Sequence, residues 1–314
     1  DYIGEVVAAT YIADNVGITV NALNSIEVGA EYGWNYAAKG NKPVFFIVNK
    51  LDSEQSKFDK VIEDAKAQFG NSVTVFQYPM NAGPNFDTII DVLSMKAYKF
   101  TGDTKAQATD IPAGEMSKAE GYRNQLIEAI AESDEDLMNA YFEEGTLSDE
   151  QISTGLGKAI NGRGIFPVFC VSSKNFVGFE PLLNFITNNL PSPNELPLNV
   201  AEGSVKAVCD AKSQVSLFVY KAVSDARLGD MTYFKVMSGK LTSGLDLINE
   251  RTGSGERFGS LFVVAGKKRE EVTELLAGDI GATVKLKSAH INDTLHEKGY
   301  NVKFEKMVYP NPKV

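Results

Sequence analysis

The spacing of apolar positions changes along the chain, and this change predicts two kinds of domain. Up to about residue 190, short apolar runs alternate with segments in which apolar residues recur every three or four positions. Strands are predicted at residues 17–20, 44–48 and 165–171, and helices near residues 3–7 and at 28–39, 58–69 and 179–186. Alternating strands and helices favour a parallel α/β sheet with right-handed crossovers.

An α+β subdomain is predicted to be inserted into this sheet, from about residue 70 to residue 164. Residues 73–78 and 89–99 have strand character, and one or two helices are indicated by Leu126, Ile130, Leu137 and Tyr141. Between Asp110 and Glu150 the insert has twelve acidic residues and two basic ones. This imbalance fits either a solvated helical face or a docking surface for a basic partner.

The clearest domain boundary is the proline-containing linker at residues 190–195, so the first domain is expected to span residues 1–194. Short strands separated by glycine-containing turns then predict an antiparallel β-barrel over residues 195–298. Its strands are expected at residues 205–209, 217–222, 232–237, 245–249, 257–264 and 280–286. Residues 299–314, one strand followed by Pro310 and Pro312, are expected to begin a truncated third domain.

Composition narrows the choice of partners. The length of 314 residues fits two or three domains, and the net charge of -10 argues against a broad electrostatic grip on DNA or RNA. Any RNA contact must be local; the basic cluster at residues 267–269 is either a solvated loop or an rRNA phosphate contact. Cys170 and Cys209 lack metal-ligand spacing and are expected to be buried free thiols in a reducing compartment. No apolar run approaches the roughly 20 residues of a membrane span, so we expect a cytoplasmic protein with no membrane partner.

Candidate chemistry begins where the strand at residues 44–48 ends, in the tetrad Asn49-Lys50-Leu51-Asp52. Open α/β sheets bind ligands at the carboxyl ends of their strands. The Asp52 carboxylate can accept hydrogen bonds from the ring N–H and the exocyclic amine of guanine, a pair that adenine lacks. Asn49 can bond the base and tie neighbouring loops together, and the stem of Lys50 can lie against the ring. The alternative is an ordinary turn, because turns favour these residue types.

A second polar turn, Ser172-Ser173-Lys174, follows the strand predicted at residues 165–171. Backbone N–H groups of Ser172 and Ser173 can donate to the carbonyl oxygen of a purine, and Lys174 can cover the ring opposite Lys50. The alternative is a strand-to-helix turn with a serine N-cap. In the nucleotide interpretation, the two polar turns converge on one guanine ring.

Taken in order, these motifs resemble an internal segment of elongation factor G, in the translational GTPase family, or of a close paralogue. The resemblance is carried by the tetrad and by residues 1–6, 166–170, 182–193, 234–244 and 268–282. The insert between the two polar turns is similar to the one that distinguishes elongation factor G within this family. Asn15, Asn21, Asn24, Ser25 and Ser173 depart from the residues usual in the family, which suggests a diverged paralogue.

The resemblance implies a truncated P-loop-type GTP-binding domain followed by a translation-factor β-barrel. It implies a ribosomal translocase that binds GTP or GDP with Mg²⁺ and couples GTP hydrolysis to movement of tRNA and mRNA. The implied partners are rRNA and the ribosomal stalk protein, the latter at the acidic insert. Two alternatives stay open: a ribosome-protection or release-type translational GTPase, and a ribosome-binding paralogue without nucleotide.

The phosphate-binding half of such a domain has no counterpart in the sequence. No G-x-x-x-x-G-K-[ST] motif occurs, and the resemblance places the phosphate loop, the first switch and the metal-binding aspartate before Asp1. We therefore expect a monomeric fragment with no catalytic or metal-binding residue of its own. By itself it is expected to bind GTP or GDP weakly or not at all and not to hydrolyse GTP.

Overall fold

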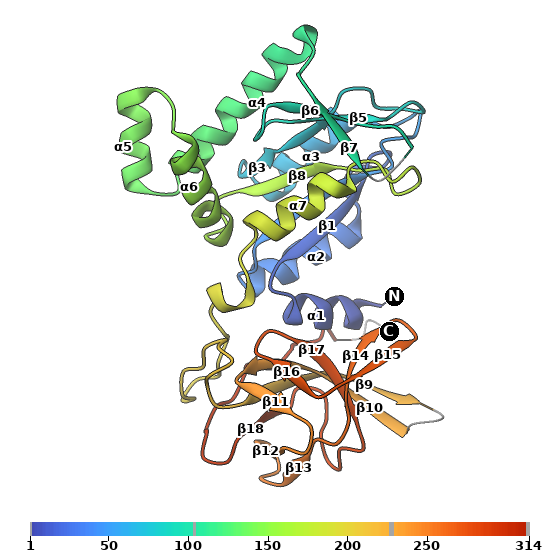
Figure 1. Ribbon diagram of the computed structural model, residues 1–314, viewed down its shortest axis with the longest axis vertical. Coiled ribbons are helices and arrows are strands. Elements are labelled where there is room, and N and C mark those ends of the chain that lie inside the picture. Colours follow the sequence, from blue (N-terminus) through green and yellow to red (C-terminus); the bar gives the residue numbers. More distant parts are fainter. Residues whose placement is uncertain (1, 103–104, 226–228, 312–314) are drawn as a thin grey trace. The chain divides into compact units, whose positions relative to one another are not determined.

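A parallel sheet forms the core of the first half of the chain in the computed structural model, which describes residues 2–102, 105–225 and 229–311 (Figure 1). Its strands are β1 (Val16–Asn21), β2 (Val44–Asn49), β3 (Val73–Val75) and β8 (Phe166–Cys170). Their order is β1-β2-β8-β3, and each neighbouring pair is parallel. The expected parallel α/β sheet is confirmed.

Helices pack on both faces of this sheet, because its strands carry apolar side chains on both sides. The helices are α2 (Val28–Lys39), α3 (Phe58–Phe69) and α7 (Phe179–Asn189). On one face, the Trp34 ring of α2 lies 6.1 Å from Phe46 of β2 and 4.8 Å from Phe69 of α3. On the other face, the Phe185 ring of α7 lies 4.6 Å from Phe169 of β8.

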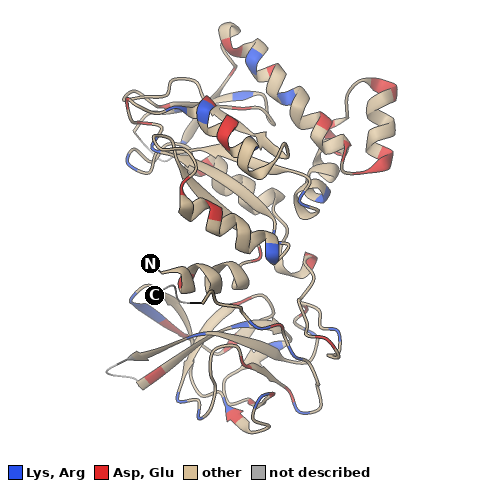
Figure 2. Cartoon of the chain, turned by 180° about the vertical axis from the view of Figure 1, so that it is seen from behind, with Lys and Arg blue, Asp and Glu red and all other residues tan. Residues whose placement is uncertain are grey.

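The insert between β3 and β8 contains a small antiparallel sheet and three helices (Figure 1). Its elements are β4 (Gln77–Pro79), β5 (Thr88–Asp91), β6 (Lys96–Phe100), β7 (Ala106–Thr109), α4 (Ala113–Ala131), α5 (Glu135–Glu144) and α6 (Asp149–Asn161). Many of the acidic side chains lie along α4 and α5 (Figure 2). None of the helices in the described residues is long and apolar enough to cross a membrane.

The two strand segments expected here do form strands, but each is divided into two. The strand expected at residues 73–78 is two strands in different sheets, with Phe76 between them. The Phe76 N–H donates to Val168 of the parallel sheet at 3.1 Å, and its carbonyl accepts from Val92 of the insert at 3.0 Å. The strand expected at residues 89–99 is a hairpin of β5 and β6, which turns at residues 92–95.

The second half of the chain is an antiparallel β structure. One sheet has the order β13-β12-β18-β9-β10-β17-β14-β15, and β11 and β16 form a separate pair. The strands are β9 (Ser216–Asp225), β10 (Gly229–Ser238), β11 (Lys240–Thr242), β12 (Asp246–Asn249), β13 (Gly255–Arg257), β14 (Leu261–Ala265), β15 (Lys268–Val272), β16 (Glu274–Leu276), β17 (Ile280–Val284) and β18 (Thr294–His296). The expected antiparallel fold is confirmed, but its sheets are not closed into a full barrel.

Three strand predictions in this half were wrong. Residues 205–209 form no strand, and the apolar run at 257–264 is interrupted at residues 258–260, between β13 and β14. In the expected final strand, Phe304 makes only an isolated bridge with Val200. Residues 312–314 of that tail lie outside the described residues.

The chain divides into two compact units, which we call the α/β unit (Asn15–Leu190) and the β unit (Asp1–Asp14 with Pro191–Val314). This grouping differs from the expected boundary, because residues 1–14 lie with the second unit. They contain α1 (Ile3–Ile12). Cys170 and Cys209, one in each unit, are free and buried, as expected.

A buried lysine anchors α1 within the β unit. Lys235 of β10 is only 4% exposed and donates to the carbonyl of Ile12 at 2.9 Å and to Asp14 Oδ1 at 2.6 Å. A cation at this position also interacts favourably with the C-terminal end of the helix dipole. The Tyr11 hydroxyl donates to the backbone carbonyl of Glu305. Burial, with the nearby Glu305 carboxylate, raises the pKa of Tyr11, so the phenol stays neutral and able to donate.

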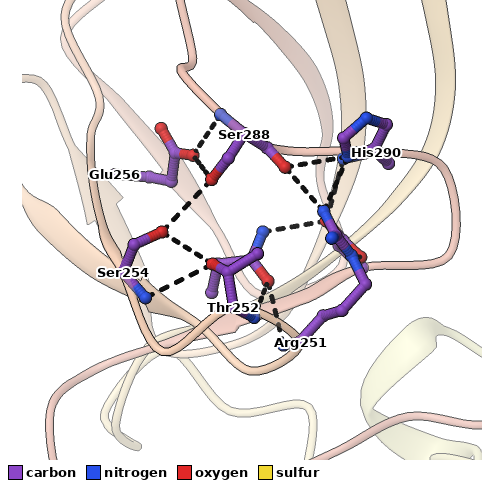
Figure 3. A network of polar contacts seen from close by, with 8 residues as sticks. Arg251, Thr252, Ser254, Glu256, Ser288 and His290 are labelled. Carbon is purple, nitrogen blue, oxygen red and sulfur yellow. Dashed lines mark hydrogen bonds and ion pairs between the residues drawn. The ribbon is translucent and has the colours of Figure 1, made fainter.

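A polar network ties the β12–β13 turn to the segment between β17 and β18 (Figure 3). Arg251 donates from Nε to Asp293 Oδ1 at 2.7 Å and from Nη2 to the Ser288 carbonyl at 2.7 Å. Glu256, which is 1% exposed, accepts from the Ser288 N–H and hydroxyl, both at 2.7 Å. Burial opposes ionisation of Asp293, but hydrogen bonds from Arg251, Asn249 and the backbone outweigh it and lower its pKa.

The anchor of α1 can be tested with Lys235→Met. The substitution leaves the Ile12 carbonyl and the Asp14 carboxylate without this donor, and we expect the β unit to lose about 1–3 kcal/mol of stability. Hydrogen exchange should show faster exchange of the α1 amides. Lys240→Met is the matched control, because Lys240 is half exposed in its pair with Glu274; an equal effect of both substitutions would contradict the anchoring role.

The Asp293 network predicts a pH dependence. A carboxyl group whose pKa is lowered by folding stabilises the protein above its ordinary value of 3.8, and this contribution is lost as the pH falls through the folded pKa. Asp293→Asn should therefore be less stable than the parent chain at neutral pH, and the difference should shrink on acidification. Denaturant unfolding of both proteins, from neutral pH to acidic pH, measures this difference in stability. Asp246→Asn, in an exposed pair with Arg257, should change little at any pH.

Candidate functional site

The two polar turns identified in the sequence lie side by side because their strands are direct neighbours. Val48 of β2 is in register with Cys170 of β8, and the Val171 N–H donates to the Val48 carbonyl at 2.9 Å. Both strands run in the same direction, so both turns leave the same edge of the sheet. This pairing brings residues 49–52 and 172–174 together across 120 positions of sequence.

Four of the six candidate side chains are joined in two pairs. Asn49 Nδ2 donates to Ser173 Oγ at 2.8 Å, and the Ser173 N–H donates back to Asn49 Oδ1 at 3.0 Å. The Ser172 hydroxyl donates to Asp52 Oδ1 at 2.6 Å. Among the described residues, the other carboxylate oxygen of Asp52 receives no hydrogen bond, so it can accept from a ligand.

Leu51, the one apolar residue of the tetrad, anchors this loop in the core. Leu51 is fully buried, and its carbonyl accepts from the Gly83 N–H at 2.8 Å. The backbone of Asn49 is fixed as well, because its carbonyl accepts from the Ala22 N–H at 2.9 Å. Lys50, at a φ of 65°, and Lys174 are both exposed. The buried leucine thus fixes the loop while the polar members of the tetrad face outward.

The serine turn is closed by contacts that sequence reasoning did not identify. The Ser172 hydroxyl accepts from the Asn175 N–H at 3.2 Å, and Ser172 and Val177 exchange backbone hydrogen bonds. Gly178 then begins α7 at a φ of 88°, where a Cβ atom would lie 2.0 Å from the Cys170 carbonyl oxygen. A glycine directly before the apolar spacing of the helix was the available signal, because only glycine fits such a position.

The polar groups at this edge have the chemistry to contact a planar base. They comprise a carboxylate oxygen, amide groups and two flexible cations. Among the described residues, no group of three or more His, Cys, Asp or Glu side chains can hold a metal ion. The residues present fit the base of a nucleotide, and they provide no identified site for Mg²⁺.

Comparison with known proteins adds the family context. Residues 1–192 match the family described as the elongation factor Tu GTP binding domain, and residues 214–298 match elongation factor G domain 2. A crystal structure of a protein from Thermus thermophilus is 26% identical, with a TM-score of 0.83 over 99% of this chain. The chain spans 45% of the length of that protein.

The geometry of the serine turn predicts a strong effect of Gly178→Ala. The new methyl group would collide with the backbone of β8, so we expect a loss of at least about 2 kcal/mol in the α/β unit. Gly145→Ala is the matched control: Gly145 has a similar φ of 72° but open space around its Cβ position, so it should cost only about 1–2 kcal/mol. Thermal or denaturant unfolding of both variants gives the comparison, and equal losses would contradict the steric argument.

Proposed function

Because the chain belongs to the family of elongation factor Tu GTP-binding domains, and is of the elongation factor G type, we propose that its α/β unit recognises the guanine base of GTP and GDP. The observation that carries this proposal is the meeting of the two polar turns. The turns leave one edge of the sheet, where the Ser172–Asp52 and Asn49–Ser173 hydrogen bonds, of 2.6 and 2.8 Å, join them.

Asp52 is the proposed specificity residue. Ser172 is buried and donates to Oδ1, which fixes the orientation of the carboxylate plane. Oδ2, and the remaining acceptor capacity of Oδ1, can accept from the ring N–H and the exocyclic amine of guanine. By analogy with paired contacts to base edges in DNA, this is worth about 1–3 kcal/mol against a base without the two donors. The proposed contacts of Lys50 and Lys174 are with the two faces of the ring.

The chain has the domains of a translation factor, and we propose that this factor is a ribosomal translocase. In that role, GTP hydrolysis is coupled to movement of tRNA and mRNA. Residues 1–314 contain no phosphate-loop motif, so the proposal assigns them base recognition and assigns hydrolysis and Mg²⁺ binding to none of their side chains.

The proposed partner is the ribosome. Helices α4 and α5 are rich in acidic residues (Figure 2), which suits them to a basic surface on the ribosome. The ribosomal stalk protein is the partner that we propose for this insert from the family resemblance. Lys267 lies in the turn between β14 and β15, and Lys268 and Arg269 begin β15; all three are exposed and suited to an RNA phosphate. One cluster of this size fits a local contact with rRNA better than a broad one, given the net charge of -10.

A second candidate, a ribosome-binding paralogue without nucleotide, is favoured by one observation. Asn49 and Ser173 already satisfy each other through two hydrogen bonds. A site whose polar groups are self-paired gains less from a ligand, because the ligand must first break these bonds.

The role of Asp52 can be tested by changing the base. Asp52→Asn replaces one acceptor oxygen with a donor, so the side chain can pair with the extra carbonyl of xanthine and no longer with the guanine amine. We expect guanine affinity to fall by about tenfold or more and the preference to move toward xanthine nucleotides. Competition of GDP and XDP against a fluorescent nucleotide measures the preference.

The matched control is Asp59→Asn, which removes an exposed carboxylate on α3. It should leave the preference for guanine unchanged. An unaltered guanine preference in Asp52→Asn would remove Asp52 from the proposed role.

A further inference from the structure

Every acceptor position on the Asn49 amide oxygen is occupied by the chain itself. Oδ1 accepts from the Ser173 N–H at 3.0 Å and from the Lys50 N–H at 2.7 Å, which uses both of its lone pairs. Nδ2 donates to Ser173 Oγ at 2.8 Å. Asn49 and Ser173 therefore form a closed ring of two hydrogen bonds between the turns.

The donors in this ring are the ones a purine needs. One edge of guanine carries the carbonyl oxygen and the unprotonated nitrogen of the five-membered ring. Both atoms are acceptors, so this edge must be met by N–H groups. Asn49 Nδ2 and the Ser173 backbone N–H, where the two turns meet, are such donors. Asn49 Nδ2 donates to the Ser173 hydroxyl oxygen, and the Ser173 N–H donates to Asn49 Oδ1.

Ser172 and Ser173 act in opposite ways. The Ser172 hydroxyl is fully buried between Asp52 and the Asn175 N–H, and it leaves Asp52 Oδ2 open. It therefore positions an acceptor without occupying it. Ser173 is exposed, and its hydroxyl oxygen accepts one of the two hydrogens that the Asn49 amide can donate.

We propose that the Ser173 hydroxyl competes with the guanine base for Asn49, so that it acts as an affinity-lowering latch across the nucleotide site. This inference rests on the proposed function and adds a residue that sets the affinity of the same site. The nucleotide must open the latch, and a chain without the hydroxyl has one hydrogen bond fewer to break. An exposed, neutral hydrogen bond is at the weak end of the usual range.

Ser173→Ala is therefore expected to bind GDP more tightly, although it removes a polar group from the site. The expected gain is about two- to fivefold, equivalent to about 0.4–1 kcal/mol at 1.4 kcal/mol per decade. Ser172→Ala should do the opposite and weaken binding, because Asp52 loses the donor that orients it. Ser173→Thr keeps the hydroxyl and should stay within about twofold of the parent chain.

The experiment is a calorimetric or fluorescence titration of the full chain with GDP, with thermal unfolding to show that each variant is folded. Ser53→Ala is the control for loss of a nearby serine, because the Ser53 side chain is outside the latch; it should leave the affinity unchanged. The latch is supported if Ser173→Ala binds GDP more tightly than the parent chain and the other variants do not. An unchanged or weaker affinity of Ser173→Ala, in a chain that binds GDP, overturns the latch and leaves the proposed function intact.

The same titration separates the other outcomes. If the parent chain does not bind GDP at millimolar concentration but Ser173→Ala does, the latch and the guanine site are both supported. If neither chain binds, and Asp52→Asn also shows no binding of XDP, the proposed function fails and the competition fails with it.

Discussion

The candidate site depends on one backbone contact, the pairing of β2 with β8. The two strands are separated in sequence by α3, β3 and the whole insert, and yet they are neighbours in the sheet. Their parallel direction makes both polar turns leave the same edge, and their register, which pairs Val48 with Cys170, brings Asn49 within hydrogen-bonding distance of Ser173. Apolar side chains fix this pairing from both faces, with Phe46 toward α2 and Phe169 toward α7. The chemistry at the edge is therefore a consequence of backbone pairing that apolar packing holds in place.

Much of this arrangement could be predicted from the sequence, because it depends on local patterns. The apolar run at residues 44–48 ends at a polar tetrad, and the structure has β2 ending at Asn49. The expectation that Asn49 ties neighbouring loops together is met by its bonds to Ser173. What could not be predicted depends on partners distant in sequence. Nothing local shows that Phe76 bridges two sheets, or that residues 205–209, which have strand composition, find no strand to pair with.

Residues 1–14 belong to one domain by sequence similarity and to the other by their contacts. By sequence they lie within the segment that matches the GTP-binding family, residues 1–192. By contacts they lie in the β unit, where Lys235 caps the end of α1 and Tyr11 reaches the backbone of Glu305. Pairing of a buried charge accounts for this grouping, since a lysine that is 4% exposed needs partners, and this helix end provides a carboxylate and a carbonyl. A hydropathy pattern cannot reveal such a requirement, because it does not identify the partner.

Because α1 packs in the β unit, the linker at residue 190 is not the only connection that holds the chain together. The chain passes between the two units twice, once after Asp14 and once after Leu190. A protease that cleaved only the second crossing would produce two pieces, and the N-terminal piece would still carry α1. That helix would remain packed on the strands of the other piece, so the nicked molecule would migrate as one species until a denaturant separated it. The β unit is thus built from two segments that are far apart in the sequence, and its integrity after such a cut would depend on the packing of α1 rather than on the linker.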